Sequence, residues 1–221
     1  MTKVAFHIGP LAEHFAEPLR VAARAASEEE PGLDVVRETV VAWRAWISEG
    51  LERNGLLARP LHWDEDASPD EPAELEVDAL RALKLFLAHG GSASCPPRLP
   101  EQPELDPAWI AMAQADFADS PYDQILVPEF WLPAAFDFTF ACPLPDGHEL
   151  QTGSIDALLT QCATLRERLF AATPLDAAMW AKAEVESRGT RALARHALGV
   201  LEQTAGRASR AHLPMLMHAG R

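Results

Sequence analysis

Basic side chains are missing from the middle of this 221-residue chain. No Lys or Arg occurs from Leu99 to Leu165, whereas eleven Asp and Glu residues fall in the same interval. Because phosphate contacts depend on Lys and Arg, we do not expect this region to bind nucleic acid. The whole chain carries a formal net charge of −14, and positive charge is in excess only over residues 166–221. This charge distribution permits a basic protein partner, bound cations or internal pairing of the basic tail with the acidic middle, and the alternative is simple solubility.

Long apolar runs and paired cysteines are also missing. No stretch approaches the roughly 20 apolar residues of a membrane span, and the first residues lack the apolar core of a secretory signal. The three cysteines, Cys95, Cys142 and Cys162, form no CxxC pair, which is typical of reduced thiols. We therefore expect a cytoplasmic protein that does not associate with membranes.

The sequence also lacks the common motifs of catalysis and metal binding. It has no GxSxG nucleophile elbow, no glycine-rich phosphate loop and no zinc-ligand spacing. His14 with Glu17, and His212 with His218, are too loosely spaced to indicate a metal site. The sequence thus predicts no cofactor and no metal. It leaves enzymatic activity open and favours a protein that is not an enzyme.

Helical periodicity is clearest between residue 34 and Gly55. Apolar side chains recur there every three or four residues, and Gly55 fits the left-handed position that ends a helix. We expect this helix to be buried on more than one side, because Val35, Ala42 and Trp46 widen its apolar face. Trp43 and Trp46 are both expected in the core.

A strand signal follows in the second half of the chain. We predict a strand over 124–127, and a hairpin in which residues 134–142 pair with 148–151 around the turn Pro145-Asp146-Gly147. Ser154 then caps an amphipathic helix. The fold class predicted is α+β: helix-rich, with one small antiparallel β-sheet, the hairpin near 134–151, packed by helices.

Five of the eighteen residues from 90 to 107 are prolines, so regular structure is not expected there. We predict a mainly helical region at 1–89, a Pro/Gly-rich linker or long loop at 90–107, and a small sheet plus helices at 108–221. A single domain overall is the alternative. Within these regions we expect a short strand over 3–8, a helix from Pro18, a helix from Pro72 and a C-terminal tail with an apolar patch at 213–217.

Two acidic stretches are candidate partner-binding surfaces. Residues 64–78 hold eight carboxylates and no basic side chain, and residues 128–133 place an acid and two aromatic rings between two prolines. Aromatic anchors with carboxylates suit recognition of a cationic surface. The alternative is that the two rings enter the core as part of a strand crossover. The candidate residues are Asp64, Glu65, Asp66, Glu129, Phe130, Trp131 and, on the polar side of the predicted strand 134–142, Asp137.

These features predict an acidic binding protein with a basic protein partner, such as an inhibitor of the immunity or antitoxin type. One alternative is an enzyme whose site assembles from dispersed residues, for example His62, Asp64, Cys142 and His148. Another is an oligomeric scaffold that docks through its apolar tail and through Arg188, Arg191 and Arg195. The oligomeric state and the identity of any partner stay open.

Overall fold

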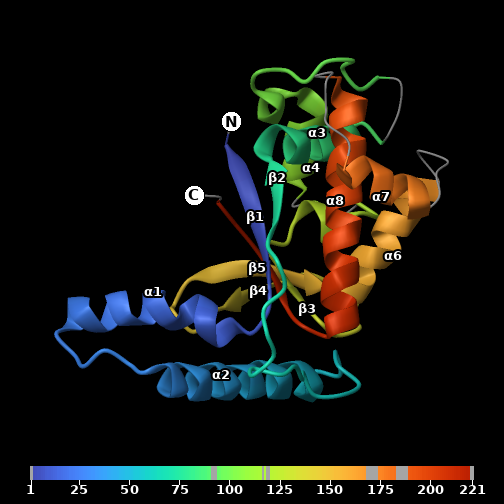
Figure 1. Cartoon of the computed structure of the whole chain (residues 1–221). Coiled ribbons are helices and arrows are strands. Elements are labelled where there is room, and N and C mark those ends of the chain that lie inside the picture. The colour runs from blue at the N-terminus through green and yellow to red at the C-terminus, as the bar shows by residue number, and fades with distance from the viewer. Residues whose placement is uncertain are drawn as a thin grey trace.

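The computed structural model describes residues 2–90, 94–115, 117, 120–167, 174–182 and 189–219. A six-stranded mixed sheet runs through the molecule in the order β2-β1-β6-β3-β5-β4. The helices α1 and α2 lie on one side of this sheet, and the long helix α8 lies on the other with α3, α6 and α7 around it (Figure 1). The α+β class is thus correct. The sheet is larger than the predicted hairpin, and it is not purely antiparallel.

The strands are short and come from all parts of the chain: β1 (Lys3–Ile8), β2 (Ala73–Glu76), β3 (Phe130–Leu132), β4 (Phe140–Pro143), β5 (Glu149–Ser154) and β6 (Met215–Ala219). The helices are α1 (Leu11–Ala26), α2 (Leu33–Arg53), α3 (Val77–Ala88), the 3-10 turn η1 (Pro103–Leu105), α4 (Pro107–Gln114), α5 (Asp123–Leu126), α6 (Ile155–Leu165), α7 (Pro174–Lys182) and α8 (Thr190–Ala211). Among the described residues, no helix combines the length and the apolar character that crossing a bilayer requires.

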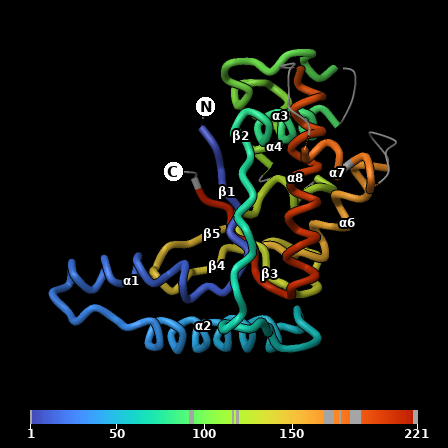
Figure 2. Tube along the Cα trace, viewed as in Figure 1, coloured from blue at the N-terminus to red at the C-terminus, as the bar shows by residue number. Residues whose placement is uncertain are grey.

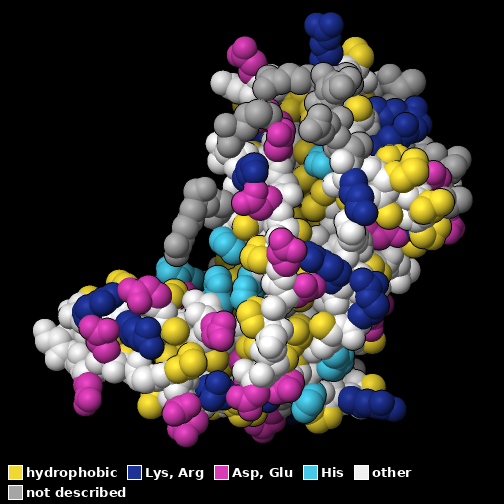
Figure 3. Space-filling view, in the orientation of Figure 1, with side chains coloured by type: hydrophobic (Ala, Val, Ile, Leu, Met, Phe, Trp, Pro, Cys, Tyr) yellow, Lys and Arg dark blue, Asp and Glu magenta, His cyan; other side chains and the backbone are white. Residues whose placement is uncertain are grey.

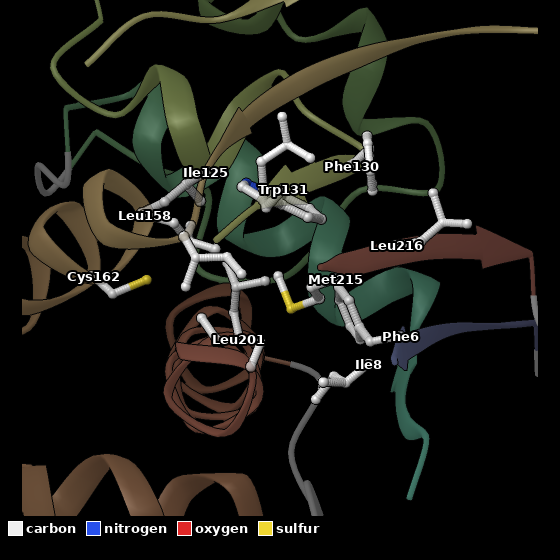
Figure 4. Close-up of a cluster of buried hydrophobic side chains, with 14 of the residues drawn as sticks. Phe6, Ile8, Ile125, Phe130, Trp131, Leu158, Cys162, Leu201, Met215 and Leu216 are labelled. Carbon is white, nitrogen blue, oxygen red and sulfur yellow. The ribbon is translucent and has the colours of Figure 1, made fainter. Parts of the chain in front are cut away.

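The segment expected to be an apolar tail is β6, a central strand. It pairs antiparallel with β1 on one side and with β3 on the other. Figure 2 shows the first and last strands of the chain running side by side. Met215 and Leu216 are buried on opposite faces of the sheet, and Figure 4 shows Met215 pointing with Phe6 toward Leu201 of α8. The apolar patch therefore fills the core and is not available to dock another subunit.

Residues 124–127 do not form the predicted strand. Residues 124–126 belong to the short helix α5, which ends at Leu126, and the side chain of Gln124 is fully buried there. Its Oε1 accepts from the N–H of Ser154 at 2.8 Å, and its Nε2 donates to the carbonyl of Phe138 at 2.9 Å. The carbonyl of Phe138 accepts a hydrogen bond from Gln124 and not from a neighbouring strand. The strand predicted over 134–142 is therefore limited to the short strand β4. The hairpin itself is confirmed, since β4 and β5 pair antiparallel.

The first region contains two further differences from the sequence prediction. Residues 73–76 form strand β2, which pairs with β1, so the helix expected from Pro72 begins only at Val77. Helix α1 begins at Leu11 and contains Pro18. It can start there because Glu65 accepts a hydrogen bond from the N–H of Ala12 at 3.0 Å, which satisfies one of the free donors at a helix N-terminus.

Helix α2 was correctly placed, but its burial is one-sided. The apolar stripe Val36, Val40, Trp43, Ile47 and Leu51 is buried, as the periodicity predicts. Val35, Ala42 and Trp46 are exposed, with Trp46 59% accessible. The predicted burial on a second side is therefore wrong: α2 packs on the sheet and on α1 and shows its other face to solvent.

The two regions flanking residues 90–107 share one sheet, because β1 of the first region pairs with β6 of the second. The proline-rich stretch is fixed near its middle, where the N–H of Thr190 donates to the carbonyl of Pro97 at 3.1 Å. Arg98 also forms an isolated bridge with Gly189. These two contacts tie the proline-rich stretch to the start of α8.

Candidate functional site

Histidines from opposite ends of the chain meet on the sheet face that α1 covers. In the antiparallel register of β1 and β6, Ala5 pairs with His218 and His7 pairs with Leu216. Since alternate residues of a strand point to the same face, His7 and His218 are diagonal neighbours there. The small side chain of Ala5 leaves room beside His218.

His14 of α1 lies over this pair. Its ring centroid is 5.5 Å from that of His7 and 5.9 Å from that of His218, and its other neighbour is the edge-on ring of Phe15 at 5.1 Å. His7 is fixed in turn, because its Nε2 donates to the carbonyl of Pro10 at 3.3 Å. Figure 3 shows the histidine side chains gathered where α1 meets the sheet. Three imidazoles are therefore held together by two strands and one helix.

The β4–β5 turn supplies two more polar groups. Gly147 has φ +85°, a conformation that glycine adopts without strain, and it closes the turn between the strands. Asp146 accepts from the N–H of His148 at 3.1 Å, and its carboxylate lies 3.0 Å from Nδ1 of the same histidine. The Asp146 side chain is only 10% exposed, whereas that of His148 is 80% exposed. The turn therefore presents a shielded carboxylate and an accessible imidazole.

Together these residues line an open cleft of about 820 Å³, which we call the histidine cleft. One face of α1 forms its wall, because positions three and four apart on a helix lie on the same side. That wall is acidic near the start of α1 and apolar further along. The lining residues are His7, Glu13, His14, Glu17, Pro18, Val21, Ala22, Ala25, Asp146, His148 and His218.

The cleft is negatively charged when its imidazoles are neutral. Its charged lining groups within the described chain are then Glu13, Glu17 and Asp146, and Glu17 is paired with Arg24 at 2.6 Å. The pKa of His14 is lowered to about 4, chiefly by burial and also by the neighbouring His7 and His218, against a smaller opposing effect of Asp146. Near neutral pH His14 therefore carries no charge.

This lowered pKa predicts a pH dependence of stability. Between about pH 4 and pH 6.5 the unfolded chain binds a proton at His14 that the folded chain does not. Stability should therefore fall as the pH is lowered through this window, and this contribution should be constant above it. Urea unfolding at several pH values should show the slope, and His14→Gln should flatten it. An unchanged slope in that variant would contradict the assignment.

Within the part of the chain that the structure describes, no three His, Cys, Asp or Glu side chains are arranged so that they could hold a metal ion. The cleft can offer hydrogen-bond donors and acceptors from its imidazoles, the carboxylates of Glu13 and of Asp146, the latter also bonded to His148, and an apolar wall. These groups suit a polar, positively charged ligand with an apolar stem.

The predicted partner-binding residues divide into two groups. Glu65 is buried, where it caps α1 and also accepts from the indole N–H of Trp63. Phe130 and Trp131 are fully buried in β3, so they form no aromatic protrusion; the alternative, in which both rings enter the core, is what the structure has. A hydrophobic ring gains more from such burial than from exposure to water. The acids that remain exposed are Asp64, Asp66, Glu129 and Asp137, of which Asp66 lies 3.3 Å from Arg37.

The residues proposed for a dispersed enzyme site do not form a thiolate–imidazole pair. Cys142 is buried, and burial raises the pKa of its thiol to about 12. Its partner across the hairpin is Leu150, while His148 turns to Asp146. His62 and Asp64 are exposed in the loop before β2. Of the arginines expected to line one helix face, Arg188 lies outside the described residues.

His7 and Asp146 were not selected from the sequence as site residues, and His14 and His218 were dismissed as metal ligands. The available signal was weak. His7 and His218 each interrupt an apolar strand sequence, KVAFHI and MLMHA, which marks a strand face that is not fully covered. No family model, curated protein or solved structure matches this chain.

Proposed function

We propose that this protein binds a basic protein partner by taking an arginine or lysine side chain of that partner into the histidine cleft. The observation that supports the proposal is the lining of the cleft: Glu13 and Asp146 beside an apolar wall. A guanidinium or ammonium group would pair with the carboxylates. Its aliphatic stem would lie along Val21, Ala22 and Ala25 of α1.

The charge of the whole chain supports the same proposal. A net charge of −14 attracts a basic partner over a distance and speeds association, and this attraction weakens as salt is added. The partner class that we propose is a basic toxin or nuclease in the cytoplasm. This protein would inhibit it in the manner of bacterial immunity proteins. The free thiols of Cys95, Cys142 and Cys162 are consistent with a reducing compartment.

Binding of an acetylated hexa-arginine peptide tests the cleft directly. We expect the double variant Glu13→Gln with Asp146→Asn to raise the dissociation constant about tenfold, which corresponds to about 1.4 kcal/mol. Both changes keep the size of the side chain and remove its charge. Isothermal titration calorimetry at low salt gives the constants, and histidine ring signals in NMR show whether the peptide lies in the cleft.

The matched control is Asp64→Asn with Asp137→Asn, which removes the same charge from two exposed acids outside the cleft. Binding should change less than twofold in this variant if local contacts matter more than net charge. Equal losses in the two double variants, or peptide binding that leaves the histidine signals unmoved, would overturn the assignment to the cleft.

A further inference from the structure

A second group of polar side chains meets where the proline-rich stretch leaves α3 and enters α4, well separated in the fold from the histidine cleft. His89 follows α3 directly, Asp106 precedes α4, and Ser94 lies between them in sequence. Oγ of Ser94 is 3.2 Å from Nδ1 of His89, and Nε2 of His89 is 3.0 Å from Oδ1 of Asp106. The His89 and Asp106 side chains are 14% and 13% exposed, whereas the bond to Ser94 faces solvent.

The state of Asp106 decides which nitrogen of His89 carries the proton. Partial burial alone would raise the pKa of Asp106, but hydrogen bonds from the N–H of Ala108 and from His89 lower it below its ordinary value. The bond from Ala108 is 2.8 Å long and makes Asp106 the N-cap of α4. An ionised carboxylate can only accept. Nε2 of His89 therefore donates to Asp106.

Neutral His89 then has its free electron pair on Nδ1, which faces the hydroxyl of Ser94. Ser94 donates its proton to that nitrogen. A hydroxyl bonded to a basic imidazole that is itself oriented by a carboxylate is the arrangement that activates a serine as a nucleophile. The arrangement is recognised by these roles and distances, whichever ring nitrogen serves as the base.

We propose that Ser94 is a nucleophile that hydrolyses activated esters, with His89 as general base and Asp106 as the positioning residue. Ser94 Oγ would form a bond to the carbonyl carbon while its proton moves to Nδ1 of His89. The C–O bond to the leaving group then breaks, and the alcohol takes that proton. Water, deprotonated by His89, would next cleave the acyl–Ser94 ester and release the acid. The reaction converts ester and water into acid and alcohol.

Labelling and turnover test this proposal on the full chain. A fluorophosphonate probe should modify Ser94, as identified by peptide mass spectrometry, and p-nitrophenyl acetate should be hydrolysed faster than in buffer. Ser94→Ala should abolish both signals, while Ser68→Ala, a change at another exposed loop serine, should alter neither. Ser94 and Ser68 are both exposed, so neither substitution opens a cavity in the core.

Asp106→Asn separates positioning from structure. Asparagine caps a helix about as well as aspartate, so the melting temperature should stay close to that of the unmodified protein. The rate should fall at least about tenfold, as expected when a general base loses its orientation, and the pH profile of the remaining hydrolysis should shift. If Ser94 is unmodified by the probe, or if Asp106→Asn leaves rate and pH profile unchanged, the three residues only tie the loop to α3 and α4. Either outcome overturns the proposal without bearing on the histidine cleft.

Discussion

Gly153→Ala is expected to destabilise the protein by about 3–5 kcal/mol, which combines the cost of overpacking with that of a disturbed buried hydrogen bond. A Cβ atom at residue 153 would lie 2.2 Å from Oε1 of Gln124 and 2.8 Å from Cγ of Pro128. Neither neighbour can move freely. Gln124 is fully buried and bonded to Ser154 and Phe138, and Pro128 is also buried. The effect should appear in urea unfolding as a lower midpoint.

The contrast is Gly50→Ala in helix α2. Apart from its chain neighbours and the adjacent backbone of α2 itself, no atom of the described chain lies within 4 Å of a Cβ at that residue. Alanine in a helix interior is favoured over glycine by roughly 0.5–1 kcal/mol, so this variant should be slightly more stable. The same substitution should thus have opposite signs at the two glycines. A loss below about 1 kcal/mol at Gly153 would show that α5 can shift away from β5 and would weaken the assignment of Gln124 as a fixed tie.

Helices were predictable because their signals are local. Ser154 is an example: it accepts from the N–H of Ala157 at 3.2 Å at the start of α6, as its predicted role as a cap requires. The β4–β5 hairpin was predictable for the same reason, because Pro145-Asp146-Gly147 fixes the turn within a few residues. In each case the residues that decide the structure are neighbours in sequence.

The rest of the sheet depends on contacts between distant segments. The sequence of β6 is apolar, but no feature of it indicates that β1 and β3 are the strands with which it pairs. Residues 124–127 have strand propensity, yet the buried bonds of Gln124 hold them in a helical turn. Tertiary contacts override local preference in both segments. The parallel pairing of β3 with β5 likewise has no local signal.

The candidate site was even harder to predict from local sequence than the sheet. The histidine cleft draws on β1, α1, the β4–β5 turn and β6, so its residues are close only after the sheet has formed. Glu65 shows the opposite error, in which a residue was predicted to be in the site but is buried elsewhere. It stands in an acidic loop with exposed neighbours on both sides, and composition gives no sign that this carboxylate turns inward to the N-terminus of α1.

Trp43→Ala is expected to cost about 3–5 kcal/mol, the range for truncating a large buried ring. The two tryptophans of α2 look alike in sequence, but only Trp43 is buried. Its indole N–H donates to the carbonyl of Pro143 at 2.6 Å, and its ring lies against Phe130 and Trp63, with centroids 6.2 Å and 6.4 Å away. Trp43 therefore anchors α2 to β3 and β4. Urea unfolding measures the loss.

Trp46→Ala is the matched control, because it removes the same ring three residues further along the same helix. Trp46 is 59% exposed, so its loss should change stability by no more than about 0.5 kcal/mol.

The two variants should also differ at the histidine cleft. Helix α1 packs on α2, so loosening α2 from the sheet in Trp43→Ala should hydrate His14 and move its pKa upward from about 4. NMR titration of the histidine rings reports this shift. A cleft unchanged in Trp43→Ala would mean that α1 is held on the sheet by its own contacts, chiefly the Glu65 cap, and that α2 contributes stability without shaping the site.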